Sequence, residues 1–328
     1  MDPKMTVKDA ASLLGVTESW VNKQLKSLKL PTTRSGGRLF FEYAAARALF
    51  QFTFRPQVVA FQIVKGGTGK TSLAFEFSIR ANLYGARVLC IDLDQQGNLT
   101  HALHADAENS PVMIDILAEG YSFDHAILPI HEGLDLLPSR IENSMLDDVI
   151  RLRKLPLNRV YADPLTKLRE KYDLIVVDCP PSLGQSVSAI TLAADRIVAP
   201  VVPEKFALAG LAATQQAICD LSKRFSTPIH LDILFNKFDP KSSISKKALA
   251  SIQESPLYRP HLLPFTIRLS PELPEAIAQG LSVFDAVKVN KAKQDIDWLT
   301  RYLLTLDENK AAAEQAKSTL SSLEELFA

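Results

Sequence analysis

The sequence has few cysteines, no long hydrophobic run and no excess of either charge. Its 328 residues include three widely spaced cysteines, so we expect neither a disulfide framework nor a cysteine metal site. No apolar run approaches a membrane span, and the N-terminus has no hydrophobic signal-peptide core. We therefore expect a cytoplasmic protein that does not bind membranes. Its length leaves room for two domains.

The balanced charge conceals a basic N-terminal segment. Lysine and arginine total 37 residues, as do aspartate and glutamate, so the formal net charge is zero. Residues 1–56 nevertheless contain nine basic and four acidic residues, a balance of +5, which leaves −5 for the remainder. A small basic segment ahead of an acidic body suggests contact with nucleic acid.

Residues 65–71 read Lys-Gly-Gly-Thr-Gly-Lys-Thr, the pattern of a phosphate-binding loop with a second lysine at its entrance. Glycines allow backbone N–H groups to turn toward phosphate oxygens, and a following helix adds the positive end of its dipole. Lys70 is placed to contact the outer phosphates, and the hydroxyl of Thr71 to ligate Mg²⁺. Lys65 requires another explanation, because the loop already has its phosphate lysine.

The flanking sequence provides the context that such a loop requires. Residues 58–64 are apolar and β-branched, which predicts a buried strand before the loop. The residues after the loop predict a helix that stops near Gly85. A glycine turn with lysines nearby by chance is the alternative, and the order strand, loop, helix argues against it.

Two further apolar runs end in carboxylates. Residues 88–91 lead into Asp92 and Asp94, and residues 173–178 end at Asp178. Continuous apolar strands are typical of a parallel sheet covered on both faces, in which ligands bind beyond the carboxyl ends of the strands. We therefore expect an α/β fold in which these carboxylates converge on the phosphates. A carboxylate there can hold Mg²⁺, directly or through water, or position the attacking water.

Together these motifs resemble the ParA/MinD group of deviant Walker ATPases. The resemblance covers roughly residues 57–305 and includes residues 199–204, 209–211, 233–237 and 267–280. It implies a P-loop NTPase with a mainly parallel sheet flanked by helices. It also implies ATP and Mg²⁺ as cofactors and an ATP-dependent homodimer in which the nucleotides are sandwiched.

The resemblance further implies a role for individual residues. Lys65 is the signature lysine that crosses the dimer to the partner's phosphates, Lys70 contacts phosphates in its own subunit, and Asp94 positions water. These three are the expected catalytic residues. Thr71 ligates the metal, and Asp178 supports it through water. The expected nucleotide-binding residues are Lys65, Gly66, Gly67, Thr68, Gly69, Lys70, Thr71, Ser72 and Asn236.

Asn236 is expected to recognise adenine at the end of a strand. A loop-capping asparagine is the alternative reading of this position. Residues 236–239, Asn-Lys-Phe-Asp, also superficially resemble the guanine-reading motif of GTPases. The rest of the chain matches the ATPases better.

The basic N-terminal segment predicts two short amphipathic helices. Thr6 and Thr17 are placed to cap them, and Gly15 provides the turn between them. A Gly-Gly pair at 36–37 between short extended pieces predicts a wing, and residues 42–50 predict a third helix. The pattern resembles the MerR-type winged helix-turn-helix over about residues 5–50.

In that class the second helix enters the major groove. Lys23 and Lys26 lie off its apolar stripe, and Arg34 and Arg38 on the wing are placed to contact phosphate or the minor groove. A solvated basic face or a protein-contact module is the alternative. For nonspecific DNA binding by the ATPase part we consider Lys246, Lys247, Arg268, Lys291 and Lys293.

The chain thus divides into four predicted segments. Residues 1–50 form the winged helix-turn-helix domain, 51–57 a short stiff linker, 58–306 the ATPase domain, and 307–328 a helical tail. The tail is rich in Ala, Glu and Leu, and its acidic residues outnumber its lysines. This composition matches anionic lipid poorly and favours a packed or coiled helix.

Three functions fit these predictions. The first is a nucleoid-associated DNA-partition ATPase that dimerises on ATP, binds DNA nonspecifically, and is released when a ParB-like centromere-binding protein stimulates hydrolysis. Its N-terminal domain would add operator binding and autoregulation. The second is a positioning ATPase that uses nucleoid DNA to distribute another cargo. The third is a transcription regulator whose dimerisation is controlled by nucleotide.

Overall fold

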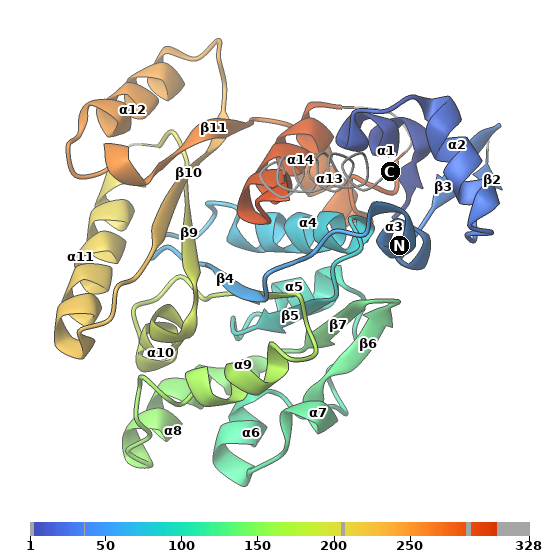
Figure 1. Ribbon diagram of the computed structural model, residues 1–328. Helices are drawn as coiled ribbons and strands as arrows, with labels where there is room; N and C mark the ends of the chain where they lie inside the picture. Colours follow the sequence, from blue (N-terminus) through green and yellow to red (C-terminus); the bar gives the residue numbers. More distant parts are fainter. Residues whose placement is uncertain (1–2, 36, 205–206, 287–289, 307–328) are drawn as a thin grey trace, which may run out of the picture.

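The computed structural model describes residues 3–35, 37–204, 207–286 and 290–306, and its centre is an eight-stranded sheet between two layers of helices (Figure 1). The strand order is β11-β10-β9-β4-β8-β5-β7-β6, and every neighbouring pair is parallel except β6 and β7. This confirms the predicted mainly parallel α/β fold. The strands are β4 (Gln57–Phe61), β5 (Val88–Asp92), β6 (Leu128–His131), β7 (Leu134–Leu137), β8 (Leu174–Asp178), β9 (Arg196–Val201), β10 (Leu231–Phe238) and β11 (Leu262–Arg268).

The helices form a layer on each face of the sheet (Figure 1). One layer consists of α4 (Lys70–Leu83), α5 (Asn98–Ala102), α13 (Glu272–Ala278) and α14 (Lys291–Leu303). The other consists of α6 (Met113–Glu119), α7 (Phe123–Ala126), α8 (Leu146–Leu152), α9 (Ala162–Leu168), α10 (Gln185–Ala193), α11 (Ala207–Phe225) and α12 (Ser243–Glu254). Short 3₁₀ turns, η1 (Ile141–Met145) and η2 (Arg259–His261), precede α8 and β11.

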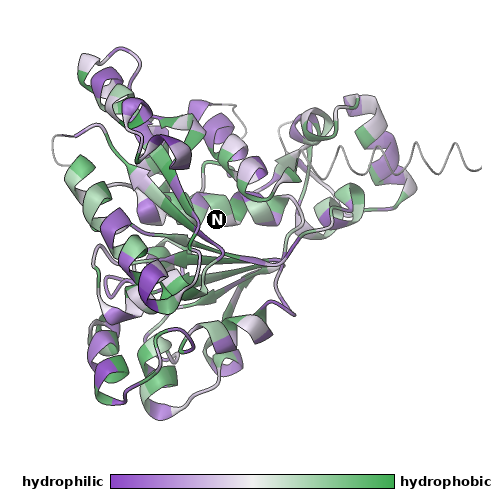
Figure 2. Cartoon of the chain, turned by 60° about the vertical axis from the view of Figure 1, so that its left-hand side comes forward, coloured by the Kyte–Doolittle hydropathy of each residue, from purple (hydrophilic) through white to green (hydrophobic). Residues whose placement is uncertain are grey.

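Alternate strand residues supply two hydrophobic cores. Val59 and Phe61 of β4 face the core beneath α4 and α14, whereas Val58 and Ala60 face the core beneath α10 and α11. Because a strand points successive side chains to opposite faces, a strand covered on both sides must be apolar at every position. Figure 2 shows these hydrophobic strands running through the middle of the molecule.

The N-terminal residues form a small unit, which we call the head (residues 3–50). Its elements are β1 (Met5–Thr6), α1 (Val7–Leu14), α2 (Glu18–Ser27), β2 (Thr33–Ser35), β3 (Arg38–Phe41) and α3 (Tyr43–Phe50). Thr6 and Thr17 cap α1 and α2 by accepting hydrogen bonds from Asp9 N and Trp20 N. Strands β2 and β3 pair antiparallel, and Gly37 has a φ of 75° at their turn. The predicted helices and hairpin are therefore present, while their use as a DNA-binding winged helix-turn-helix stays a prediction.

The head is packed directly against the rest of the chain, which we call the body (residues 57–306). Arg47 donates to Asp173 at 2.7 Å and to the carbonyl of Gly85 at 2.6 Å. The ring of Phe50 meets that of Tyr84 edge-on, with centroids 6.3 Å apart. Head and body therefore share one hydrophobic core.

The expected linker takes part in this packing. Phe52 and Phe54 pack against the shared core, and Gln57 is already the first residue of β4. Removing residues 1–50 would expose Tyr84 and its neighbours to water, so single substitutions test the head better than truncation does. The predicted tail, residues 307–328, lies outside the described residues.

Helix α4 carries a buried acid that is unrelated to the phosphate loop. Glu76 is fully buried and accepts hydrogen bonds from Ser282 Oγ at 2.7 Å and from the backbone N–H of Val283 at 3.0 Å. Burial raises the pKa of Glu76 to about 8, against which these hydrogen bonds act only in part. The acid therefore ties α4 to the segment after α13 through two accepted hydrogen bonds, while its burial disfavours the charged form.

This pKa predicts a pH-dependent contribution to stability. A carboxyl whose pKa is higher in the folded than in the unfolded chain stabilises the fold at low pH, and that stability is lost as pH rises through the folded-state pKa. Wild-type unfolding free energy should fall relative to that of Glu76→Gln between about pH 5 and pH 8, by on the order of 1 kcal/mol per pH unit. Urea unfolding of both proteins at several pH values measures this. Glu119→Gln, at an exposed position on α6, is the control, and parallel pH profiles for wild type and Glu76→Gln would contradict the assignment.

Candidate functional site

The phosphate-binding loop lies at the carboxyl end of β4 and leads into α4, as the sequence predicts. Gly67 and Gly69 have φ values of 75° and 92°, a backbone region that side chains other than glycine rarely adopt. A Cβ added at Gly66 or Gly67 would meet no atom within 4 Å, so the loop faces open space. A backbone cradle at the N-terminus of a buried helix is suited to an anion of the size of a phosphate chain.

Lys70, Thr71 and Asp178 meet at the start of α4. The hydroxyl of Thr71 donates to Asp178 Oδ2 at 2.6 Å, and the ammonium of Lys70 donates to the carbonyl of Lys65 at 3.2 Å. Lys70 is only 7% exposed, and burial lowers its pKa although the charge of Asp178 acts in the opposite direction. The structure thus brings together the two residues expected to serve the same metal, and their roles toward that metal stay predictions.

Two buried oxygens at this site have no hydrogen-bond partner among the described residues. They are Asp178 Oδ1 and Thr68 Oγ1. Burial and the neighbouring Asp92 together raise the pKa of Asp178 well above its ordinary range, because negative charge there is not compensated. A hydrated divalent cation beside Asp178 would provide that compensation, so the residues present fit Mg²⁺ held through Thr71 and, by way of water, Asp178.

All three carboxylates were expected to converge on the phosphates, but Asp92 is engaged by the protein itself. Its Oδ2 accepts from both the backbone N–H and the hydroxyl of Thr100, at 2.9 and 2.8 Å, and its Oδ1 accepts from Asp94 N at 3.1 Å. All of its hydrogen bonds are therefore used to hold the segment between β5 and α5. Burial raises the pKa of Asp92 to about 6.

Asp94 is held by a polar network that sequence reasoning did not find. Its Oδ1 accepts from Gln96 N at 3.1 Å, and its backbone carbonyl accepts from the hydroxyl of Ser139 at 2.7 Å. Asn143 in turn donates to Ser139 Oγ at 2.7 Å. Ser139 and Asn143 lie in a stretch without a periodic pattern, so no local signal pointed to them. Asp94 Oδ2 has no partner within the described part of the chain and remains available to a water molecule.

Lys65 is engaged by an acid at the end of the neighbouring strand. Its ammonium donates to Glu204, which follows β9, and this hydrogen bond lowers the pKa of Glu204. Gly210 of α11 lies against the same lysine, since an added Cβ would come 3.1 Å from Lys65 Cβ. The side chains of Lys65 and Glu204 are 22% and 58% exposed, so the pair lies at the surface beside the loop. Lys65 must therefore leave Glu204 before it can reach another subunit.

Asn236 braces the loop from β10. Its Nδ2 donates to the carbonyl of Thr68 at 2.8 Å, and its Oδ1 accepts from Lys237 N at 2.8 Å. Lys237 Nζ also donates to the carbonyl of Gly67 at 2.9 Å. A Cβ at Gly69 would come within 2.6 Å of Asn236 Nδ2, so glycine is required for this approach. The geometry supports the loop-capping alternative, and recognition of adenine stays a prediction.

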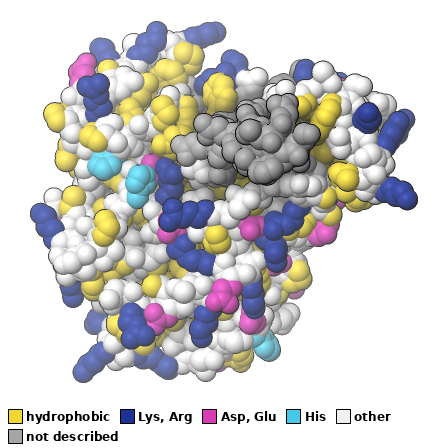
Figure 3. Space-filling view, in the orientation of Figure 1, with side chains coloured by type: hydrophobic (Ala, Val, Ile, Leu, Met, Phe, Trp, Pro, Cys, Tyr) yellow, Lys and Arg dark blue, Asp and Glu magenta, His cyan; other side chains and the backbone are white. Residues whose placement is uncertain are grey.

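The predicted DNA-binding residues fall at two ends of the molecule. Lys23 and Lys26 are exposed on α2 and Arg34 and Arg38 on the hairpin of the head, whereas Lys246 and Lys247 are exposed on α12. Figure 3 shows lysine and arginine side chains over both ends. Arg268 was expected to be available for DNA. Its guanidinium instead pairs with the buried carboxylate of Asp295 at 2.6 Å.

The fold and the loop together define a P-loop NTPase. A family described as an AAA domain, AAA_31, matches residues 56–232, which is more than half of the chain. The chain therefore belongs to this family, and its relatives place it with the ParA-type ATPases. Among the described residues, no helix is long and apolar enough to cross a membrane.

Two curated relatives and one solved structure are similar to this chain. The cell division protein PomZ of Myxococcus xanthus is 30% identical over 264 residues, 78% of this chain and 80% of PomZ. The virulence plasmid ParA family protein pGP5-D of Chlamydia psittaci is 29% identical over 79% of this chain and 97% of its own. Cobyrinic acid a,c-diamide synthase from Mycobacterium smegmatis, solved with an ATP analogue and magnesium, has a TM-score of 0.63. It is 25% identical, and the match covers 77% of this chain and 94% of that chain.

Substitution of Asn236 distinguishes loop bracing from adenine recognition. If Asn236 braces the loop, Asn236→Ala should weaken ATP and GTP binding by the same factor, roughly fivefold to tenfold, as expected for one lost hydrogen bond. Equilibrium binding of fluorescent ATP and GTP analogues measures both affinities. Asn158→Ala, at an exposed turn, is the matched control. A loss confined to ATP would instead establish Asn236 as an adenine-reading residue.

Proposed function

We propose that this protein is a ParA-type DNA-partition ATPase that dimerises on ATP and binds DNA. The observation that carries the proposal is the loop itself, in which Lys70 is buried at the start of α4 while a second lysine, Lys65, lies at the surface. In the family that the chain resembles, a second lysine at this position reaches phosphate charge of a neighbouring subunit, and the partly exposed position of Lys65 is compatible with that role. The curated relatives named for ParA support the same function.

Hydrolysis in this proposal depends on residues that already occupy fixed positions. Mg²⁺, when bound, would supply positive charge to offset that of the outer phosphates. Thr71 and, by way of water, Asp178 would hold the metal, and Lys70 would donate to the outer phosphates from its buried position. Asp94 accepts a hydrogen bond from the attacking water and orients it, while Ser139 and Asn143 keep the Asp94 backbone in place.

DNA binding is proposed to involve both ends of the molecule. The head would recognise an operator through Lys23, Lys26, Arg34 and Arg38, and the body would bind DNA of any sequence through Lys246 and Lys247 of α12. A ParB-like protein is the proposed stimulator of hydrolysis, and a nucleoid-associated cytoplasmic location follows from DNA binding. Arg268 does not belong to this surface, because it is paired with Asp295.

A second function has its own support. PomZ, which is named as a cell division protein, is as similar to this chain as the plasmid relative is. The same ATPase cycle could therefore position a cargo other than plasmid DNA. The two functions share the nucleotide site, the dimer and the DNA surface, and they differ in the partner that stimulates hydrolysis.

Asp94→Ala tests the role of the water-positioning carboxylate. The variant should bind ATP and dimerise like wild type, because Asp94 does not hold the nucleotide. Its kcat should fall by roughly a hundredfold or more, the range for a lost acid–base group. Phosphate release under saturating ATP, with the Kd for ATP measured separately, separates the two effects. Asp163→Ala on α9 is the control, and loss of ATP binding with normal turnover of bound nucleotide would exclude the role.

Lys65→Ala tests the action of Lys65 on a partner subunit. We expect the variant to bind a non-hydrolysable ATP analogue within about threefold of wild type, since Lys70 remains, but to stay monomeric. Sedimentation velocity with and without the analogue reports the assembly state. Lys167→Ala, an exposed lysine on α9, should dimerise normally. A Lys65→Ala protein that dimerises like wild type would exclude a role for Lys65 across the interface.

A further inference from the structure

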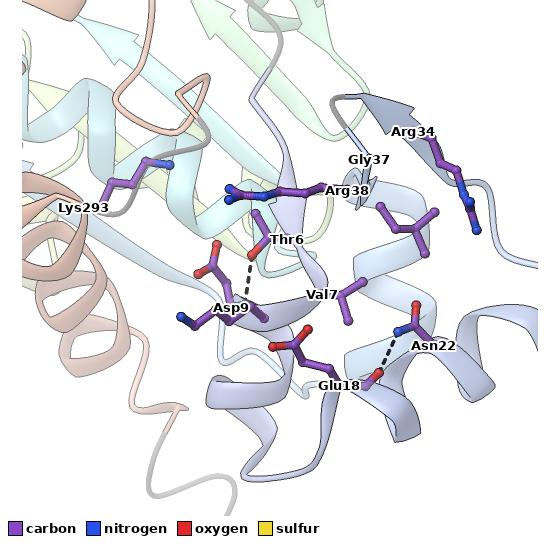
Figure 4. Close-up of a pocket in the computed structure, with 11 residues that line it drawn as sticks. Thr6, Val7, Asp9, Glu18, Asn22, Arg34, Gly37, Arg38 and Lys293 are labelled. Carbon is purple, nitrogen blue, oxygen red and sulfur yellow. Dashed lines mark hydrogen bonds between the residues drawn. The ribbon is translucent and has the colours of Figure 1, made fainter.

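A cavity of about 550 Å³ lies where the head meets the body. The head contributes residues of α1, α2 and the β2–β3 hairpin, and the body contributes Lys293 of α14. Figure 4 shows the side chains of Arg38 and Lys293 extending toward each other from opposite sides of this cavity. We call this cavity the seam pocket.

Cations predominate in the seam pocket. Lys8, Arg34, Arg38 and Lys293 line it, against two carboxylates, Asp9 and Glu18. The first three cations are exposed and have no side-chain partner among the described residues. Lys293 Nζ donates to the carbonyl of Ala286, a neutral group. The charge of this cluster is therefore only partly compensated within the described structure, and an anion is the ligand it would attract.

The seam pocket is distinct from the body surface on α12. Arg38 belongs to β3 of the head, whereas Lys293 lies in the first turn of α14 and is partly buried. Burial lowers the pKa of Lys293, and the carboxyls of Asp9 in the head and of Glu76 and Asp285 in the body oppose that effect. A phosphate group between Lys293 and Arg38 would stabilise both charges at once.

We propose that the backbone of bound DNA enters the seam pocket and that Lys293 of the body and Arg38 of the head grip the same DNA molecule. The proposal rests on DNA binding by the head, and it adds that the specific site is built jointly by head and body. Glu18 and Asn22 lie on the α2 side of the pocket, where their acceptors suit base edges better than phosphates. The two kinds of contact, backbone and base, then occur on neighbouring walls.

The packing around the pocket makes a joint site physically reasonable. Arg80 of α4 is fully buried, pairs with Asp297 of α14 at 2.5 Å, and reaches Met5 Sδ of the head at 3.6 Å. Its guanidinium also lies 4.8 Å from the ring centroid of Phe284. Head, α4 and α14 are thereby held as one unit, so Arg38 and Lys293 keep a constant relation to each other.

The test uses the full-length protein and its dependence on salt. Each lysine or arginine that neutralises a phosphate adds about 0.9 to the slope of log K against log salt concentration. We expect Lys293→Ala and Arg38→Ala each to reduce this slope by about 1, and the double variant by about 2. Fluorescence anisotropy with labelled duplex DNA from the region upstream of the gene, between about 50 and 200 mM salt, measures it.

Matched variants separate charge from folding. Lys293→Arg keeps the charge and should preserve the wild-type slope, whereas Lys293→Glu should weaken binding more than Lys293→Ala does. Lys167→Ala removes a lysine on the opposite face of the sheet and should leave the slope unchanged. Unchanged ATP binding by each variant shows that the fold is intact.

Two different failures have different meanings. If Arg38→Ala reduces the slope and Lys293→Ala does not, the joint site is overturned while DNA binding by the head stands. If wild-type protein binds no duplex with or without ATP, the proposed function itself is wrong. A third outcome would assign the pocket to a small anion and overturn the DNA proposal. In it, millimolar inorganic phosphate stabilises wild type but not Lys293→Ala, and Lys293→Ala leaves the salt slope of DNA binding unchanged.

Discussion

The burial of α4 is the constraint on which the rest of this structure depends. Twelve of its fourteen residues are buried, including Lys70, Glu76 and Arg80. Its first turn presents Lys70 and Thr71 to the phosphate loop, its middle is tied to the segment after α13 by Glu76, and its last turns hold the head through Arg80 and Tyr84. A helix that is held along its whole length cannot be displaced at one end without strain at the other.

The nucleotide site is shaped largely by neighbouring strand ends. Asp178 at the end of β8 accepts from Thr71, Asn236 at the end of β10 braces Thr68, and Glu204 after β9 pairs with Lys65. Three neighbours of the loop thus determine its shape before any ligand binds. Such preorganisation means that phosphate binding requires little rearrangement of the loop, whereas in the proposed dimer Lys65 would have to exchange Glu204 for a phosphate.

The head is best understood as an extension of the body's core. Arg47, Phe50 and the phenylalanines of the connecting segment fill one side of α4, so the head cannot swing freely. In the proposed DNA-bound dimer, the orientation of the two heads would therefore be set by the orientation of the bodies. The seam pocket lies at this junction, where DNA contacts from both parts are possible.

Much of this protein was predictable from local sequence. Apolar runs of four or more residues identified β4, β5 and β8, glycines and lysines identified the phosphate loop, and Thr6 and Thr17 marked the two capped helices. These signals are local, because strand burial, backbone φ and helix capping depend on residues close in the chain. The contacts between distant segments were not predictable from the sequence. They are the partners of Lys65, Asp94 and Asn236, the pairing of Arg268 with Asp295, and the approach of Lys293 to Arg38. Only the tertiary structure decided these contacts, because they join residues far apart in sequence whose distance in space depends on strand order and helix packing.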